Sequence, residues 1–167
     1  MDALCGFPPI ADTRSRILIL GSMPSEASLR KQQYYGHPQN TFWKLMPALL
    51  DEAFAEDYGE RKAMLLRHGI ALWDVLRRCE REGSLDSNIK KPEVNDFPAF
   101  FAEHPGIRRV YLNGGMAYSL FKKHVGFAPG MEYVRVGSTS PAHAISFETR
   151  LADWRRMLPL PEGGEAK

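Results

Sequence analysis

Residues 34–43 place aromatic rings and an amide close together, in a pattern that could bind a planar, polar molecule. Tyr35 and His37 supply rings, and Asn40 supplies the amide. A ring can stack on a heterocycle, while an amide can hydrogen-bond the heterocycle's edge or hold a water molecule. The same residues also have a structural interpretation, because asparagine is a good helix N-cap and aromatic side chains often pack in cores. The residue types alone leave both interpretations open.

The segment that precedes these rings is typical of a buried strand that ends in a tight turn. Residues 16–20 are largely apolar, and Gly21 and Pro24 interrupt the run. An open α/β sheet usually places its ligand in a loop outside the carboxyl end of its first strand. A second loop, residues 137–143, consists of small and polar residues and follows another expected strand at 132–136. The chain thus carries two candidate loops, each of which follows an expected strand.

Three segments resemble motifs of the uracil-DNA glycosylase superfamily. They are Gly-Ser-Met-Pro-Ser at 21–25, Tyr-Tyr-Gly-His-Pro-x-Asn-x-Phe-Trp at 34–43 and Ser-Thr-Ser-Pro-Ala at 138–142. Within that superfamily the chain is most similar to the hypoxanthine-DNA glycosylase branch, although the middle segment is also similar to the mismatch-specific branch. The motifs stand in the expected order, and the resemblance covers most of the chain.

The resemblance implies both a fold and an activity. The fold is a three-layer α/β/α sandwich around a mainly parallel four-stranded sheet, which the alternation of expected strands and helices also indicates. The activity is hydrolysis of the N-glycosidic bond of a deaminated base in DNA, with hypoxanthine (deoxyinosine) as the expected base and an abasic site as the product. A uracil- or mismatch-specific glycosylase of the same fold and a non-catalytic nucleic-acid-binding module are the alternatives.

The resemblance to the hypoxanthine branch points to Asn40 as the catalytic amide. An asparagine cannot accept a proton near neutral pH, so it would orient a water molecule without acting as a true general base. That suits a dissociative mechanism, in which the bond to the base is largely broken before water attacks. Asn40 could also cap the following helix, and the two roles can coexist.

The base-binding pocket is expected to combine residues from the first motif with residues at the ends of two later strands. Tyr35 is the first candidate to stack on the base and Phe42 is the second, although Phe42 and Trp73 could equally be core residues and Asn113 could simply cap a turn. The predicted pocket residues are Gly21, Ser22, Met23, Tyr35, Phe42, Trp73 and Asn113.

The later motif is expected to bind the DNA strand. Hydroxyls and backbone amides can hydrogen-bond phosphates, and Pro141 with Ala142 could press into the minor groove where the base has left. Several relatives open this motif with a histidine that polarises the base carbonyl, whereas Ser138 stands there in this chain. His143 is expected to contact a phosphate or begin a helix sooner than to act in catalysis. The predicted DNA-binding loop is Ser138, Thr139, Ser140, Pro141, Ala142 and His143.

Composition and length fit a small globular protein. The 167 residues suffice for one domain, and the net charge of +2 means that a phosphate-binding surface must be local. Two separated cysteines cannot hold a typical iron–sulfur cluster, and no metal-ligand spacing occurs, so we expect no metal and no cofactor. The sequence shows no signal peptide and no membrane span, which predicts a cytoplasmic protein. The resemblance implies damaged DNA, double- or single-stranded, as the partner, and we expect a monomer.

The remaining segments are assigned by their periodicity. We expect a surface arm at 1–15 and a long loop at 77–94. The expected helices are 42–54, 59–67, 97–103, 116–124 and 144–158; the expected strands are 16–20, 70–76, 108–112 and 132–136; and residues 159–167 form a flexible tail.

Other enzyme classes find little support in the sequence. The turn at 21–24 does not match the G-x-S-x-G elbow of serine hydrolases, and neither a Walker loop nor a Rossmann glycine pattern occurs. The water-holding motif positions also lack a lysine, which would be needed for a Schiff base with the sugar. The sequence therefore predicts a monofunctional glycosylase.

Overall fold

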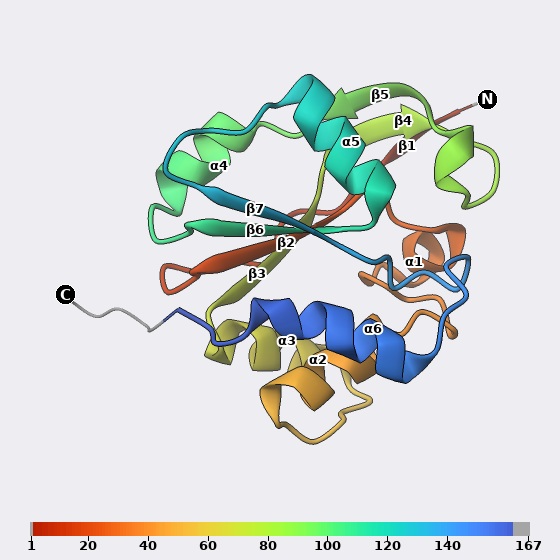
Figure 1. Ribbon diagram of the computed structural model, residues 1–167. Helices are drawn as coiled ribbons and strands as arrows, with labels where there is room; N and C mark the ends of the chain where they lie inside the picture. The colour runs from red at the N-terminus through yellow and green to blue at the C-terminus, as the bar shows by residue number, and fades with distance from the viewer. Residues whose placement is uncertain (1, 162–167) are drawn as a thin grey trace.

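A central sheet of four parallel strands organises the computed structural model, which describes residues 2–161 (Figure 1). The strand order is β3-β2-β6-β7, so the first strand of the sheet lies in its interior. The register pairs Ile17 with both Ile70 and Arg109, which aligns the carboxyl ends of the strands. The strands are β2 (Ile17–Gly21), β3 (Ile70–Asp74), β6 (Arg109–Asn113) and β7 (Glu132–Val136).

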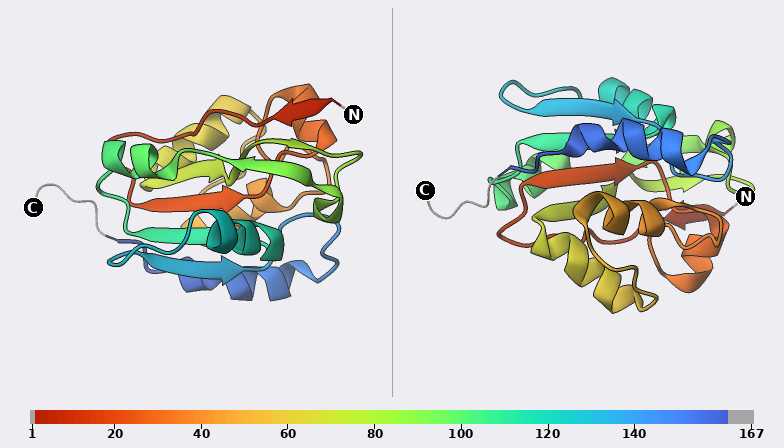
Figure 2. Two further views of the ribbon diagram at one scale, coloured as in Figure 1. Left: turned by 90° about the horizontal axis from the view of Figure 1, so that it is seen from above. Right: turned by 60° about the horizontal axis from the view of Figure 1, so that its bottom comes forward.

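Helices cover both faces of this sheet, which confirms the predicted three-layer α/β/α sandwich (Figures 1 and 2). One face carries α4 (Phe97–Glu103) and α5 (Gly115–His124). The other carries α2 (Phe42–Leu50), α3 (Tyr58–Arg67) and α6 (Phe147–Trp154). A short helix, α1 (Glu26–Lys31), lies near the carboxyl ends of the strands.

The core lies on both sides of β2 and β3, and every residue of these two strands is buried. Strands covered on both faces read as continuous apolar runs, which is why residues 17–20 and 70–73 could be recognised from sequence. Fully burying one such aliphatic side chain stabilises the fold by about 1.5–3 kcal/mol. Phe97 and Phe121 fill the core on one side, and Trp154 fills it on the other.

A second, antiparallel sheet corrects two of the sequence predictions. Its order is β1-β4-β5, with bounds Ala3–Cys5, Leu76–Glu80 and Lys90–Val94. The segment predicted as a long loop at 77–94 is therefore a β-hairpin, whose tip contains the 3₁₀ turn η1 (Asp86–Asn88). The predicted surface arm contains a strand that pairs with β4. The hairpin was missed because β4 and β5 are rich in charged residues and their pairing shifts register, so neither shows a regular apolar alternation.

Helix ends differ from prediction where a local signal was overlooked. Helix α2 ends at Leu50, not at 54, because Asp51 adopts the left-handed conformation that terminates helices. Helix α6 begins at Phe147, where Ser146 caps it, and continues as the 3₁₀ turn η2 (Arg155–Met157). Helix α1 was not predicted, although Ser25 is its N-cap. Of the tail predicted at 159–167, residues 162–167 lie outside the described residues.

Within residues 2–161 no helix combines the length and the apolar character that a membrane crossing requires.

Candidate active site

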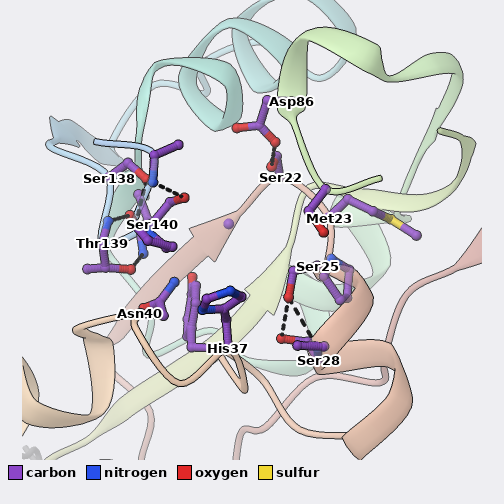
Figure 3. Close-up of a pocket in the computed structure, with 18 of the residues that line it drawn as sticks. Ser22, Met23, Ser25, Ser28, His37, Asn40, Asp86, Ser138, Thr139 and Ser140 are labelled. Carbon is purple, nitrogen blue, oxygen red and sulfur yellow. Dashed lines mark hydrogen bonds between the residues drawn. The ribbon is translucent and has the colours of Figure 1, made fainter. Parts of the chain in front are cut away.

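A cavity of about 630 Å³ opens at the carboxyl ends of the parallel strands, where both candidate loops meet. Figure 3 shows Asn40 beside the 138–140 segment, with Ser22 and Asp86 across the cavity from it. Its walls come from the loop and helix after β2, the ends of β3 and β6, the hairpin tip and the loop after β7. The sheet therefore brings together segments that lie more than a hundred residues apart in the chain.

One wall of the cavity is the ring of Tyr35. This ring stacks on Phe42 with centroids 4.3 Å apart and planes inclined by 29°. Phe42 is fully buried behind it, so the ring that lines the cavity is held from its rear by a core residue. Tyr35 also has a positive φ of 54°, which is uncommon for a bulky residue and costs conformational energy. The loop thus holds this ring in a position that an unrestrained chain would rarely adopt.

The floor of the cavity is formed around Gly21 and Asp74. A Cβ atom at position 21 would lie 2.6 Å from Asp74 Oδ1 and 2.9 Å from Tyr35 Oη, so only glycine leaves both polar groups in place. Asp74 Oδ2 and Tyr35 Oη are both buried, and neither has a hydrogen-bond partner among the described residues. Buried polar groups normally have partners, so two orphaned ones at the floor of a cavity indicate a ligand-binding surface.

Burial changes the pKa values of the carboxyl groups in and near the floor. It raises the pKa of Asp74 to about 7, and the neighbouring charge of Asp86 adds to the increase while Arg81 opposes it. Burial also raises the pKa of Asp86, against the lowering effects of Arg81 and of the Ser22 hydroxyl. Ser22 Oγ donates to Asp86 Oδ1 over 2.6 Å, which ties the hairpin tip to the first motif. Asp74 can therefore carry a proton near neutral pH and act as a donor as well as an acceptor.

Asn40 reaches the cavity from the start of α2. Its Oδ1 accepts a hydrogen bond from the backbone N–H of Phe42 over 2.9 Å, and this bond identifies which atom of the amide is the oxygen. The N-cap position itself is Thr41, whose side chain makes no capping bond. Asn40 thus satisfies one of the free amides of the first helical turn, and its oxygen keeps a second lone pair for a water molecule.

The loop after β7 is fixed at its centre by Asn113. The amide of this residue donates to Thr139 Oγ1 over 3.1 Å, and its oxygen accepts from the Thr139 backbone N–H over 3.0 Å. The Thr139 carbonyl in turn accepts from the backbone N–H of Thr41 over 3.2 Å. One buried threonine therefore joins the end of β6, the loop at 138–143 and the residue after Asn40.

Helix α6 fixes both ends of the same loop. Buried Arg150 donates to the carbonyls of Ser138 and His143, and Trp154 Nε1 donates to the carbonyl of Gly137 over 2.8 Å. Between these anchors Pro141, Ala142 and His143 are exposed. The loop is thus rigid at its base and presents a small-residue tip to solvent.

The structure brings together most of the predicted site residues at this cavity. Two predicted pocket residues lie elsewhere: Phe42 supports Tyr35 from behind, and Trp73 packs against Phe100 while its Nε1 donates to the Phe7 carbonyl. The predicted residues that line the cavity are Gly21, Ser22, Met23, Tyr35, Asn40, Asn113, Ser138, Thr139, Ser140, Pro141, Ala142 and His143.

The sequence analysis missed all three carboxylates that line the cavity: Glu26, at the start of α1, and Asp74 and Asp86. Asp74 is the last residue of a buried strand, and a charged residue at that position was itself a signal. Side chains alternate along a strand, so Asp74 and Trp73 point to opposite sides, and only one of them could face the cavity. Asp86 lies in the hairpin that was predicted as a loop and had no comparable signal. In the part of the chain that the structure describes, no group of three or more His, Cys, Asp or Glu side chains could hold a metal ion.

Comparisons with known proteins bear on the family of the chain and on its overall fold. The family model described as Uracil DNA glycosylase superfamily matches residues 8–161. A protein of Methanosarcina barkeri named hypoxanthine DNA glycosylase is 38% identical over 155 residues, which span 89% of this chain and 94% of the relative. A protein of Methanosarcina acetivorans with the same name is 39% identical over 156 residues, or 92% and 96% of the two chains. The NMR structure of a candidate uracil DNA glycosylase from M. acetivorans is 36% identical and superposes with a TM-score of 0.78, covering 93% of this chain and 96% of that one.

Proposed function

The chain belongs to the uracil DNA glycosylase superfamily, and on this basis we propose that it excises hypoxanthine from deoxyinosine in DNA. The reaction is hydrolysis of the N-glycosidic bond, and its product is an abasic site. Two relatives that carry the name hypoxanthine DNA glycosylase and align over nearly their whole length support this choice of base.

The observation that carries the proposal is the pairing of a stacking wall with an orphaned polar floor. A flipped base can lie against the Tyr35 ring, with its edge toward the free oxygen of Asp74. Hypoxanthine offers an N1–H donor next to the O6 acceptor. A carboxyl group that retains its proton can accept from the first and donate to the second, so the raised pKa of Asp74 suits this edge.

The attacking water is assigned to Asn40. The remaining lone pair of its Oδ1 can accept a hydrogen from water, while the bond from Phe42 N–H keeps the amide from rotating. The structural and the catalytic role of Asn40 therefore support each other. The hydrogen bond to the start of α2 fixes the amide, and the fixed amide orients the water. Asn40 positions the water but does not accept its proton, which is sufficient for a dissociative mechanism because the bond to the base is largely broken before the water attacks.

The enzyme acts as a monofunctional glycosylase. No lysine occurs among the described residues that line the cavity, so an amine that could attack the sugar is missing there. Borohydride treatment during turnover should therefore trap no covalent protein–DNA adduct. A trapped adduct would show a lyase mechanism.

The substrate is damaged DNA, either double- or single-stranded, and we propose that a cytoplasmic monomer acts on it. The hydroxyls of Ser138 and Ser140 each accept a backbone N–H two residues later, and both remain able to donate to phosphate oxygens. The exposed large apolar side chains of the described residues are spread over separate elements: Phe54, Leu85, Phe127, Ile145 and Leu158. Such scattered residues do not form the contiguous patch that a stable dimer interface needs.

A substrate panel tests the function. Duplexes and single strands that contain one hypoxanthine, uracil or xanthine are incubated with the protein, and abasic sites are then cleaved with alkali. We expect cleavage at hypoxanthine above the other two bases, and loss of cleavage for Asn40→Ala. Preferred excision of uracil would favour the alternative of a uracil- or mismatch-specific enzyme. Binding without cleavage of any substrate would favour a non-catalytic module.

A further inference from the structure

A large apolar side chain stands at the mouth of the cavity. Leu85 is 54% exposed and lies among the cavity-lining residues, next to polar Ser84, Asp86 and Ser87 at the hairpin tip. Exposed leucines are ordinary when they are scattered over a surface. This one borders the space that the extruded base must enter, so its position calls for an explanation.

The hairpin tip that carries Leu85 is held on both sides. Before it, buried Arg81 donates to the Gly83 and Pro24 carbonyls, each over 2.7 Å, and Ser84 Oγ accepts from the backbone N–H of Glu26 over 2.9 Å. After it, Asp86 accepts from Ser22. The exposed apolar group is therefore on a fixed support that is joined to the first motif.

The opposite rim has no comparable group. Between Ser138 and His143 the largest apolar side chains are those of Pro141 and Ala142. The apolar wedges that open base steps are Phe, Leu, Ile, Met and Pro, and proline is the smallest of these. Among the described residues that line the cavity, Leu85 combines a larger apolar side chain with high exposure.

We propose that Leu85 is the wedge that enters the duplex where the target nucleotide leaves the stack, across the cavity from the loop at 138–143. This inference rests on the proposed function, because it takes duplex DNA with a damaged base as the partner. The wedge occupies the vacated space from the hairpin side, while the small residues of the loop allow the strand backbone to approach closely. Leu85 makes no contact with the reacting atoms and acts only on extrusion.

The test compares Leu85→Ala with the wild type on one strand that contains deoxyinosine, used both alone and in a duplex. We expect the single-turnover rate on the duplex to fall roughly tenfold, because the wedge offsets part of the cost of unstacking. The rate on the single strand should stay within about twofold, since its base is already unpaired. Leu85→Met should restore most of the duplex rate. Leu158→Ala is the matched control, because Leu158 is 37% exposed and lies outside the cavity lining.

A fluorescent 2-aminopurine placed beside the target separates this proposal from the proposed function. With wild-type protein its emission should rise as the step opens, and with Leu85→Ala the rise should be smaller. Equal losses of rate on both substrates would mean that Leu85 acts in the base pocket. An unchanged duplex rate would mean that Leu85 has no role in extruding the base. Either result overturns the proposal. If the wild type excises no hypoxanthine from either substrate, the proposed function fails, while the emission change still decides whether Leu85 opens the duplex.

Discussion

The floor of the cavity, around Gly21 and Asp74, differs in polarity and exposure from its rim, which carries Leu85 and Pro141. At the floor, Asp74 and the Tyr35 hydroxyl are buried without partners within the described chain, and Gly21 leaves no room for a further atom. At the rim, Pro141 and Leu85 are exposed on loops that Arg150 and Arg81 anchor through hydrogen bonds to backbone carbonyls, although Arg81 Nη1 is itself buried without a partner among the described residues. The floor thus presents tightly packed polar groups to a ligand, whereas the rim presents exposed apolar side chains.

Because of this difference, the two regions contribute differently to the stability of the free protein. Orphaned polar groups at the floor destabilise the free protein, and a base that pairs with them recovers that free energy on binding. Exposed residues at the rim add little to stability in either direction. Substitutions that remove an orphaned polar group at the floor should therefore change both stability and the chemical step, while substitutions at the rim should change only the handling of the duplex.

The largest effect should come from Asp74→Asn, measured as stability against pH. The pKa of Asp74 is raised from 3.8 to about 7, so between these values the folded protein keeps a proton that the unfolded chain has lost. The free energy of unfolding of the wild type must then decrease as pH rises through this window and level off above it, in total by roughly 4 kcal/mol. The variant lacks this group, so its stability relative to wild type should increase from pH 4 to pH 7. Denaturant midpoints at several pH values check this; parallel pH curves would mean that Asp74 ionises normally.

Asn40→Ala should lower the single-turnover rate by about 10²-fold, because the water loses its positioning group. The same change removes the partner of the Phe42 N–H and should cost about 1 kcal/mol of stability. Asn40→Asp is the matched control, since aspartate accepts that bond equally well and should keep the melting temperature. A folded Asn40→Ala protein with near wild-type excision would exclude Asn40 from the mechanism.

Gly21→Ala should affect catalysis more than folding. The added Cβ would collide with the ends of two side chains, Asp74 and Tyr35, which can move without displacing backbone. Misplacement of these groups should lower the excision rate by about tenfold, and the melting temperature should change little. Double substitution with Asp74→Ala removes one colliding atom, so the two changes should be non-additive. Strict additivity would show that the floor residues act independently.

Pro141→Gly should produce the smallest effect. It loosens the rim, so duplex excision should slow by a few-fold while single-strand excision is nearly unchanged. Rates on both substrates, together with duplex affinity, provide the measurement. A loss of similar size on both substrates would mean that the loop shapes the pocket, and the contrast between floor and rim would be lost.

The strands that were most evident from the sequence are those that are buried on both faces. Residues 17–20 and 70–73 are enclosed on both faces and show it as unbroken apolar runs, so the parallel sheet was evident from the sequence. The antiparallel sheet was not evident, because the side chains of β4 and β5 that face solvent are charged. In addition β1, the other partner of β4, is only three residues long. A strand that relies on distant backbone partners leaves little local pattern.

The site was predictable where function resides in a local motif. The segments at 21–25, 34–43 and 138–142 are each continuous, and the sheet only had to bring them together. Asp74 and Leu85 depend on three-dimensional context: the first on which side of a strand end faces the cavity, the second on a hairpin that folds over it. Phe42 shows the converse: its residue type suited a base-stacking role, but the structure places it in the core behind the ring of Tyr35.

The first ten residues set a practical limit on how this protein can be shortened. The family match begins at residue 8, yet the Phe7 carbonyl accepts from Trp73 and the Pro8 carbonyl accepts from Tyr34. Residues 3–5 also form the edge partner of β4, the strand that leads to the hairpin tip. A chain trimmed to the matched segment would expose the backbone of β4 as a free sheet edge, which invites association with other chains. We therefore expect the stable folding unit to be longer than the segment that the family model matches, and an expression tag or fusion partner should be joined without disturbing residues 3–10.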